Sequence, residues 1–285
     1  MRTNALALVA LAPAALGCTG AVASSAEQAD AETTASTTAV VIVERTGDDG
    51  HGSRAEASAR FLRVDARVPA DDALRAIGAG LDLPARGTCA NIAELAPATG
   101  QAAPVVELID VGAVSLEAAG GETRLVPRQL PDVTDLVSGI VYARAAELAL
   151  LPADARYIVH VGGGRDLDAF DAVAWAPGDP ADVRISGEDV AGLVVANGPV
   201  VDLAWTPGGS DDAVYVDVAP GRVRCLLGEA GRDGVERATI PASMLADAGG
   251  ALVVHRVHRE SLPAHGIDSG EIRFDFARSS SYVRR

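Results

Sequence analysis

Apolar and polar residues alternate in four runs of the second half of the chain. The runs are Val201–Trp205, Val214–Val218, Val223–Leu227 and Ile272–Phe276. A period of two gives a strand one apolar and one polar face, which is typical of half-buried antiparallel sheets. Because turn residues such as Pro, Gly and Asp separate the first three runs, we predict short strands joined by turns, with their polar faces in solvent.

Shorter apolar runs occur in the first half. Val40–Val43 and Phe61–Val64 predict two strands, and the polar stretch Thr46–Glu56 between them predicts a loop. The acidic pair Asp71–Asp72, followed by apolar residues, predicts one helical turn that ends near Gly78.

Glycine also divides the apolar stretch Pro104–Leu116. We predict a strand there, a bend at Gly112, and then a second strand. A further strand is predicted at Gly139–Ala143, and the residues that follow it, Arg144–Leu151, are compatible with a helix.

The turn residues Pro152–Asp154 predict a domain boundary. A β-rich domain is expected at 40–150 and a β-sandwich domain at 156–280. In the second domain Trp205 and Cys225 resemble the core residues of immunoglobulin-like domains, although no second cysteine lies at the expected strand. The predicted fold class is therefore all-β, with an immunoglobulin-like β-sandwich in the second half and a second β-rich domain in the first half.

The first eighteen residues have the layout of a secretory signal. A basic start, Met1–Arg2, precedes the apolar stretch Ala5–Leu16, and small residues follow. The apolar stretch is too short to cross a membrane, which needs about 20 apolar residues. We therefore expect residues 1–18 to be a signal peptide and the mature chain to be exported.

The residues Ala15–Cys18 resemble the lipobox of bacterial lipoproteins, with Ala15 where that family usually has Leu. The resemblance implies that Cys18 becomes the lipidated first residue, since two acyl chains hold a protein stably at a membrane. The alternative is cleavage after Ala21–Ala23, an A-x-A site, which would release a soluble secreted protein that starts at Ser24.

A polar stretch follows the signal. Ser24–Ala39 contains no large apolar residue, so it cannot bury enough surface to offset chain entropy. We predict a disordered tether over 19–39. A flexible coil of this length reaches about 20–25 Å, which agrees with a lipid anchor.

Composition excludes several classes of function. The formal net charge of −15 over 285 residues makes nucleic acid and anionic headgroups poor partners. All 24 basic residues are arginine. Schiff-base chemistry, the P-loop lysine and the S-x-x-K acylation motif each require a lysine, so these mechanisms are excluded.

Two cysteines, Cys89 and Cys225, remain once Cys18 is cleaved off or lipidated. An even count in an oxidising compartment is consistent with a disulfide between them. Two unpaired cysteines, one of them buried in a strand, are the alternative.

Recognisable catalytic motifs are absent from the sequence, which contains neither G-x-S-x-G nor H-E-x-x-H. His255 and His258 are three residues apart in one predicted strand, so they lie on opposite faces and cannot bind one metal together. We interpret all five histidines as structural. The glycine-rich Gly162–Arg165 resembles a phosphate loop but lacks G-x-G-x-x-G, so a glycine hairpin is predicted instead.

Aspartates cluster in two predicted turns. Carboxylates are the ligands that Ca²⁺ prefers, and the candidates for a calcium site are Asp166, Asp168, Asp171, Asp211 and Asp212. The regular spacing of a calcium-binding loop is missing, so solvated turns explain these residues equally well. We assign no cofactor and no catalytic residue.

These features together predict an exported, lipid-anchored protein of the cell envelope, on the outer membrane or the periplasmic side. It would act as a binding or structural module for a protein or an envelope polymer. The alternative is a secreted or tethered hydrolase of an envelope polymer that uses carboxylates as acid and base. A hydrolase requires a concave site in which carboxylates converge and at least one pKa is raised, whereas a surface module requires only ordinary exposed carboxylates.

Overall fold

The chain forms two units, Met1–Thr33 and Thr34–Arg285, and every described residue belongs to the second. The computed structural model describes residues 34–47, 53–95, 104–130, 137–180, 183–189, 194–196, 199–205, 212–218, 222–227, 236–245 and 249–284. The predicted signal peptide 1–18, including Cys18, lies outside the described residues, as do 19–33 of the predicted tether. Most described residues lie in strands, which confirms the all-β fold class.

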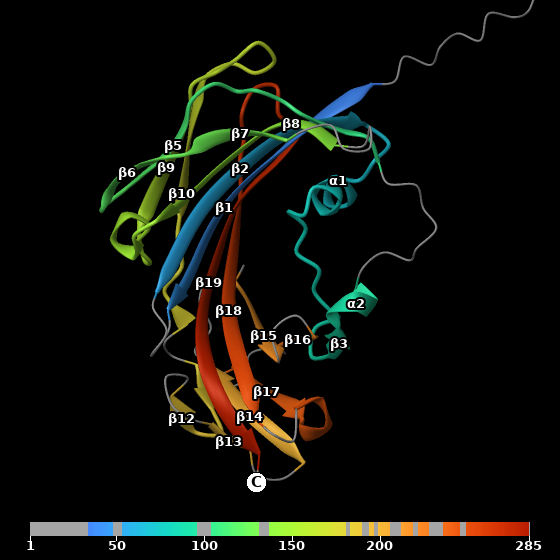
Figure 1. Cartoon of the computed structure of the whole chain (residues 1–285), viewed down its shortest axis with the longest axis vertical. Helices are drawn as coiled ribbons and strands as arrows, with labels where there is room; N and C mark the ends of the chain where they lie inside the picture. Colours follow the sequence, from blue (N-terminus) through green and yellow to red (C-terminus); the bar gives the residue numbers. More distant parts are fainter. Residues whose placement is uncertain are drawn as a thin grey trace, which may run out of the picture. The chain divides into compact units, whose positions relative to one another are not determined.

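One sheet of eleven strands dominates the described part of the chain (Figure 1). In order across the sheet, its strands are β3 (Cys89–Asn91), β16 (Val223–Leu226), β15 (Ala213–Val218), β18 (Gly250–Ser261), β19 (Ser269–Arg284), β1 (Ala35–Gly47), β2 (Arg54–Asp65), β4 (Val106–Leu108), β8 (Val137–Ala146) and β7 (Val126–Leu130), while β13 (Val194–Ala196) pairs with β19. Below we call it the large sheet.

Two four-stranded sheets pack on one face of the large sheet. The first contains β10 (Phe170–Trp175), β9 (Arg156–Val161), β5 (Val114–Ala118) and β6 (Gly121–Arg124). The second contains β12 (Glu188–Asp189), β11 (Arg184–Ile185), β14 (Val200–Trp205) and β17 (Glu236–Pro241). Within the described residues, the helical segments are α1 (Ala70–Ala76), α2 (Ile92–Leu95) and the 3₁₀ turns at Leu148–Leu150 and Ala242–Met244.

Each small sheet encloses its own hydrophobic core against the large sheet. The first core contains Phe61 of β2, Tyr157 of β9 and Phe274 of β19. The second contains Trp205 of β14 and Leu252 of β18. The long strand β19 takes part in both cores, so the fold is two β-sandwiches that share one sheet (Figure 1).

The predicted halves of the chain meet in the large sheet. Strand β1 pairs with β19 in parallel, with Val41 opposite Ile272 and Val43 opposite Phe274. The predicted boundary at Pro152–Asp154 therefore lies inside a single compact unit that runs from Thr34 to Arg285. Trp205 and Cys225 share the second core, while the immunoglobulin-like topology stays a prediction.

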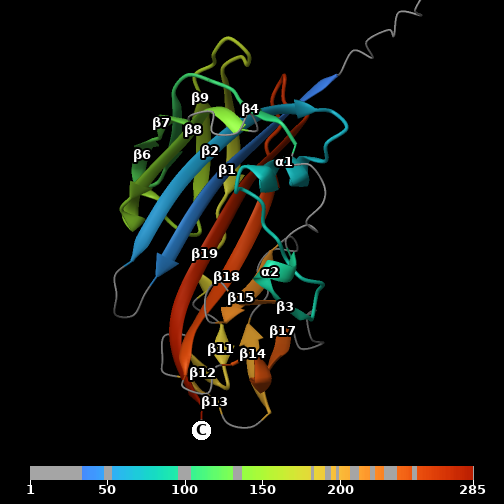
Figure 2. The ribbon, with the colours of Figure 1, turned by 45° about the vertical axis from the view of Figure 1, so that its right-hand side comes forward.

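A covering segment lies on the other face of the large sheet, which we call the outer face (Figures 1 and 2). Residues 66–91, named here the strap, run from the end of β2 through α1 to β3. Leu74 of α1 packs with Val40, Ile42 and Leu62 in a third cluster. At its far end, the strap joins the edge of the sheet because β3 pairs with β16.

Three local predictions need correction. Strand β1 begins at Ala35, so 35–39 of the predicted tether are strand, and the hairpin pairs Thr46 with Arg54, so the predicted loop 46–56 is shorter. The backbone hydrogen bonds of β2 extend the strand whatever the polarity of its side chains. Residues 144–146 end strand β8, and only Leu148–Leu150 is helical, as a 3₁₀ turn.

The bend at Gly112 is confirmed. Its φ is +74°, a conformation that favours glycine, and a Cβ there would lie 2.3 Å from the carbonyl oxygen of Gly163. The strands on either side, β4 and β5, therefore belong to different sheets. The helical turn predicted after Asp71 is also confirmed, as α1.

Candidate functional site

Charged side chains gather on the outer face where strands of the large sheet present their polar residues. On neighbouring strands, Glu44 of β1 lies opposite both Glu56 of β2 and Asp275 of β19. Two residues along the strands, Ile42 lies opposite Ser58 and Arg273. A row of carboxylates thus lies beside a row that contains a guanidinium, separated by one pleat repeat of about 6.6 Å.

These residues line a cavity of about 310 Å³ that is open to solvent. The strap contributes Gly78, Gly80 and Leu81 to its wall. The charged residues that line it include Glu44, Glu56, Arg60, Arg224, Arg273 and Asp275. A larger hollow at the β18–β19 turn, about 710 Å³, contains no comparable set of charges, so the cavity under the strap is the better candidate site.

The strap buries charges that the alternating pattern predicted to be solvated. The side chain of Arg273 is only 6% exposed and that of Asp217 only 10%. Arg273 donates a hydrogen bond of 2.5 Å to the carbonyl oxygen of Ala79 in the strap. The prediction of a solvent-facing polar side therefore fails here, because a segment with no regular strand pattern covers it.

Asp275 is the centre of a closed hydrogen-bond network. Its carboxylate accepts a bond of 2.9 Å from the Tyr215 hydroxyl and lies 2.7 Å from His255 Nδ1. Burial alone would raise the pKa of Asp275, but these contacts and the charge of Arg273 lower it, so the carboxylate stays ionised. Burial and the nearby Asp275 raise the pKa of Tyr215 well above its ordinary value.

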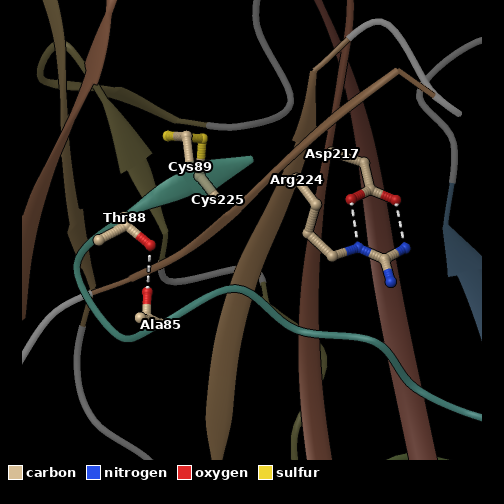
Figure 3. The surroundings of a disulfide bond; sticks show 6 residues. All are labelled: Ala85, Thr88, Cys89, Asp217, Arg224 and Cys225. Atoms are coloured by element: carbon tan, nitrogen blue, oxygen red, sulfur yellow. Dashed lines mark hydrogen bonds and ion pairs between the residues drawn. A yellow bond between two sulfur atoms is a disulfide. The ribbon is translucent and has the colours of Figure 1, made fainter. Parts of the chain in front are cut away.

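Arg224 extends this network across the sheet (Figure 3). Its Nε and one terminal nitrogen each lie 2.8 Å from a different oxygen of Asp217, which is a bidentate pair. Its guanidinium lies 4.5 Å from the ring centre of Tyr215, and the His255 ring stacks on Tyr215 at 4.2 Å. A third nitrogen donates to the carbonyl oxygen of Asp82, which ties the strap to the network.

Three charged groups of the cavity are incompletely paired within the described part of the chain. Arg60 makes one hydrogen bond, of 3.2 Å, to the hydroxyl of Ser58, and no ion pair with a described carboxylate. One terminal nitrogen of Arg273 makes no hydrogen bond, although Glu271 Oε1 lies 3.4 Å away. Glu44 forms neither a hydrogen bond nor an ion pair with any described residue.

The pKa values of these three groups are all shifted from their ordinary values. Glu44 is exposed at the mouth of the cavity, yet the surrounding protein atoms, and then Asp275 and Glu56, raise its pKa. Burial lowers the pKa of both Arg60 and Arg273; the nearby carboxylate of Glu44 opposes both shifts without cancelling them, and Arg273 lowers the pKa of Arg60 further. Each group would therefore be stabilised by a ligand of opposite charge.

A disulfide closes the strap at its far end. Cys89 of β3 and Cys225 of β16 lie opposite one another, with their sulfur atoms 2.03 Å apart (Figure 3). Within the strap, the Thr88 hydroxyl donates to the carbonyl oxygen of Ala85 at 2.6 Å. The covering segment is thus bonded covalently to the sheet beside the cavity.

The histidines have separate environments. His255 lies in the cavity network, whereas His258 on the opposite face of β18 contacts Asp212 at 2.7 Å and Glu260 at 3.2 Å. His160 lies between Asp171 and Glu117, at 2.7 and 3.2 Å. His265 is exposed in the β18–β19 turn, and His51 lies outside the described residues.

The calcium candidates are not brought together. Asp166 pairs with Arg63, Asp171 with His160, and Asp212 with His258, while Asp168 is exposed near His265. Asp211 falls outside the description. Among the described residues no cluster of three or more His, Cys, Asp or Glu could hold a metal ion, and none of the described helices is long and apolar enough to cross a membrane.

Sequence reasoning missed the residues of the cavity. A usable signal was present, because the polar positions of the alternating strands carry opposite charges that can pair, as Asp217 and Arg224 do. What the alternation could not show is which strands become neighbours. The row of Glu56, Glu44 and Asp275 forms only because β19 inserts beside β1.

Comparisons with known proteins give a weak structural similarity. No family model matches the chain, and no curated protein matches its sequence. The solved structure of the zebrafish (Danio rerio) Fcho1 Mu homology domain with bound Eps15 peptide matches with 9% identity, covering 87% of this chain and 97% of that one, with a TM-score of 0.25. A similarity at that level does not bear on the function.

Proposed function

We propose that this chain is an exported, lipid-anchored envelope protein whose folded unit acts as a binding module. The observation that supports this most directly is the disulfide between Cys89 and Cys225. Disulfides persist in oxidising compartments and are rare in the cytosol. The bond therefore agrees with the signal-like N-terminus and with attachment through Cys18.

The hydrogen-bond network in the cavity favours binding over catalysis. The groups best suited to proton transfer, His255, Asp275 and Tyr215, are joined to each other by short hydrogen bonds. A catalytic acid or base must instead reach a substrate atom. A cavity wall made of groups that are already bonded to each other suits recognition of a polar ligand, since little ordering of that wall is required on binding.

A mature chain that begins at lipidated Cys18 is the central expectation, and it is tested by expressing the full chain in a bacterium that processes lipoproteins. Intact mass should show a diacylglycerol on Cys18, and the protein should partition into detergent. Cys18→Ala should remove both properties. A soluble product that starts at Ser24 would overturn the anchor and leave a secreted protein.

One observation favours a second candidate, the hydrolase of an envelope polymer. Glu44 has a raised pKa and lies opposite Glu56 and Asp275, which is the arrangement in which one carboxyl acts as acid and another as base. This candidate expects purified protein to degrade envelope polysaccharide or peptide, and Glu44→Gln to abolish that activity. If the wild-type protein has no such activity, the hydrolase is excluded and the binding module remains.

A further inference from the structure

The cavity under the strap contains incompletely paired charges of both signs. Glu44 and Arg60 influence one another and have other charged neighbours, but neither forms an ion pair with a residue that the structure describes. Arg273 also lines the cavity; its side chain is 94% buried, and one terminal nitrogen makes no hydrogen bond, although it lies 3.4 Å from Glu271 Oε1. A buried donor of this kind costs free energy until it is satisfied, so a bound anion would stabilise Arg273.

The arrangement of these charges restricts the ligand. Arg273 and Glu44 belong to neighbouring rows of the sheet, about 6.6 Å apart along the strands. A bound group must contact a guanidinium at one end and a carboxylate at the other within that distance. A small molecule with a carboxylate and an ammonium on the same carbon atom meets this requirement, whereas a long chain with distant charges does not.

The net charge of the whole protein also favours a ligand that carries both charges. With a formal net charge of −15, the molecule repels small anions before they reach Arg60 and Arg273. A zwitterion has no net charge and avoids this barrier. A cavity of about 310 Å³ is at the lower end of the range for small-molecule sites.

We infer that the cavity binds a free α-amino acid, with its carboxylate between Arg60 and Arg273 and its ammonium beside Glu44. The inference rests on the proposed binding function and specifies the ligand class of that same site. Ser58 Oγ, 3.2 Å from Arg60, would orient the guanidinium. His255 and Asp275 form the wall and hold no part of the ligand's charge, since each already has a partner.

The test is calorimetric titration of the purified full chain with glycine, each of the other nineteen common amino acids, and D-alanine. Acetate and methylammonium serve as probes that carry one charge each. At least one amino acid should bind with a dissociation constant below about 1 mM, and each single-charge probe should bind at least about tenfold more weakly. No binding by any amino acid at about 10 mM, or acetate binding as tightly as the best amino acid, would overturn the inference.

Two variants test which residue binds each charge of the ligand. Arg60→Gln should weaken binding of both the amino acid and acetate at least about tenfold, whereas Glu44→Gln should weaken the amino acid and leave acetate unchanged. Arg128→Gln and Glu122→Gln, exposed on β7 and β6, make the same charge changes away from the cavity and should have no effect. Equal effects of matched and control variants would contradict the site. Lipidation at Cys18 is measured separately, so a failed titration leaves the export proposal intact.

Discussion

At the scale of residues, the cavity network shows how buried charges are tolerated in this fold. Asp275 has two hydrogen-bond partners and Asp217 a bidentate arginine. Paired charges of this kind do not by themselves add much stability, but removing one partner leaves the other buried and uncompensated. Substitutions in the network therefore test the pairing of the buried charges more than the volume of the side chains.

Replacing Asp275 by Ala should lower the free energy of unfolding by about 3–5 kcal/mol, since the Tyr215 hydroxyl and His255 lose their common partner. Tyr215→Phe removes one hydrogen bond and should cost only about 1–2 kcal/mol. Urea denaturation at neutral pH measures both. Because the pKa of Asp275 is lowered on folding, its contribution is present above its ordinary pKa and is lost as the pH falls through the folded value. Similar, small losses for both variants would contradict this role.

His160 provides a second test at this scale. Its hydrogen bond with Asp171, and then that with Glu117, raise its pKa above 6.5. The stabilisation is complete below the ordinary pKa and disappears as the pH rises through the raised folded value. NMR titration of the imidazole should show a pKa above 6.5 that falls in Asp171→Asn. An unchanged value in that variant would show that Asp171 is not the cause. Arg128→Gln, remote from the ring, serves as the control.

At the scale of elements, the strap decides which part of the outer face is a cavity. It is anchored at one end by Leu74 of α1 and at the other by the disulfide. The hydrogen bonds from Arg273 to Ala79 and from Arg224 to Asp82 hold it between these ends. Loss of one anchor should therefore affect the cavity more than the two cores on the opposite face.

The double variant Cys89→Ser with Cys225→Ser tests the covalent anchor. The cysteines are 136 residues apart, so the chain-entropy model gives a loss of about 5 kcal/mol, an upper value. Limited proteolysis should then cut near Arg86 in the strap before any site in the cores. Thr88→Ala, which removes only the bond to Ala85, serves as the control and should leave the strap protected. Cleavage first within β18 or β19 would contradict an anchoring role.

At the scale of the whole molecule, the two sandwich layers depend on one sheet. Strand β1 contributes Val41 and Val43 to the same core as Phe274 and Phe276 of β19, although more than two hundred residues separate them in the sequence. Separating the chain into two fragments near Pro152–Asp154 would expose that core. The two halves are therefore expected to be interdependent in folding.

Separate expression of residues 40–150 and 156–280 tests this dependence. Each fragment loses a neighbouring strand of the large sheet and should show no cooperative thermal transition by circular dichroism. Mixing or co-expressing the two should restore a transition, since the missing core partners are then present. A cooperative transition in either fragment alone would show that the predicted domains fold independently.

The sequence alone determined the strands with a clear alternation of apolar and polar residues. Alternation at Val201–Trp205 and Ile272–Phe276 predicted β14 and part of β19, because one face of each must be buried whatever the topology. Gly112 likewise predicted its bend, since its backbone conformation is a local property. The two cysteines were identified as a possible pair by their number.

Only the tertiary structure decided what the polar faces do. The insertion of β19 beside β1 places Asp275 next to Glu44, and the strap then forms one wall of the cavity beside them. The local pattern of apolar and polar residues predicts neither arrangement, because strand order is selected by the combined burial of residues far apart in the sequence. The alternating pattern of a strand is the same whether its polar face is exposed to solvent or covered by another segment. Only the folded structure therefore shows the cavity.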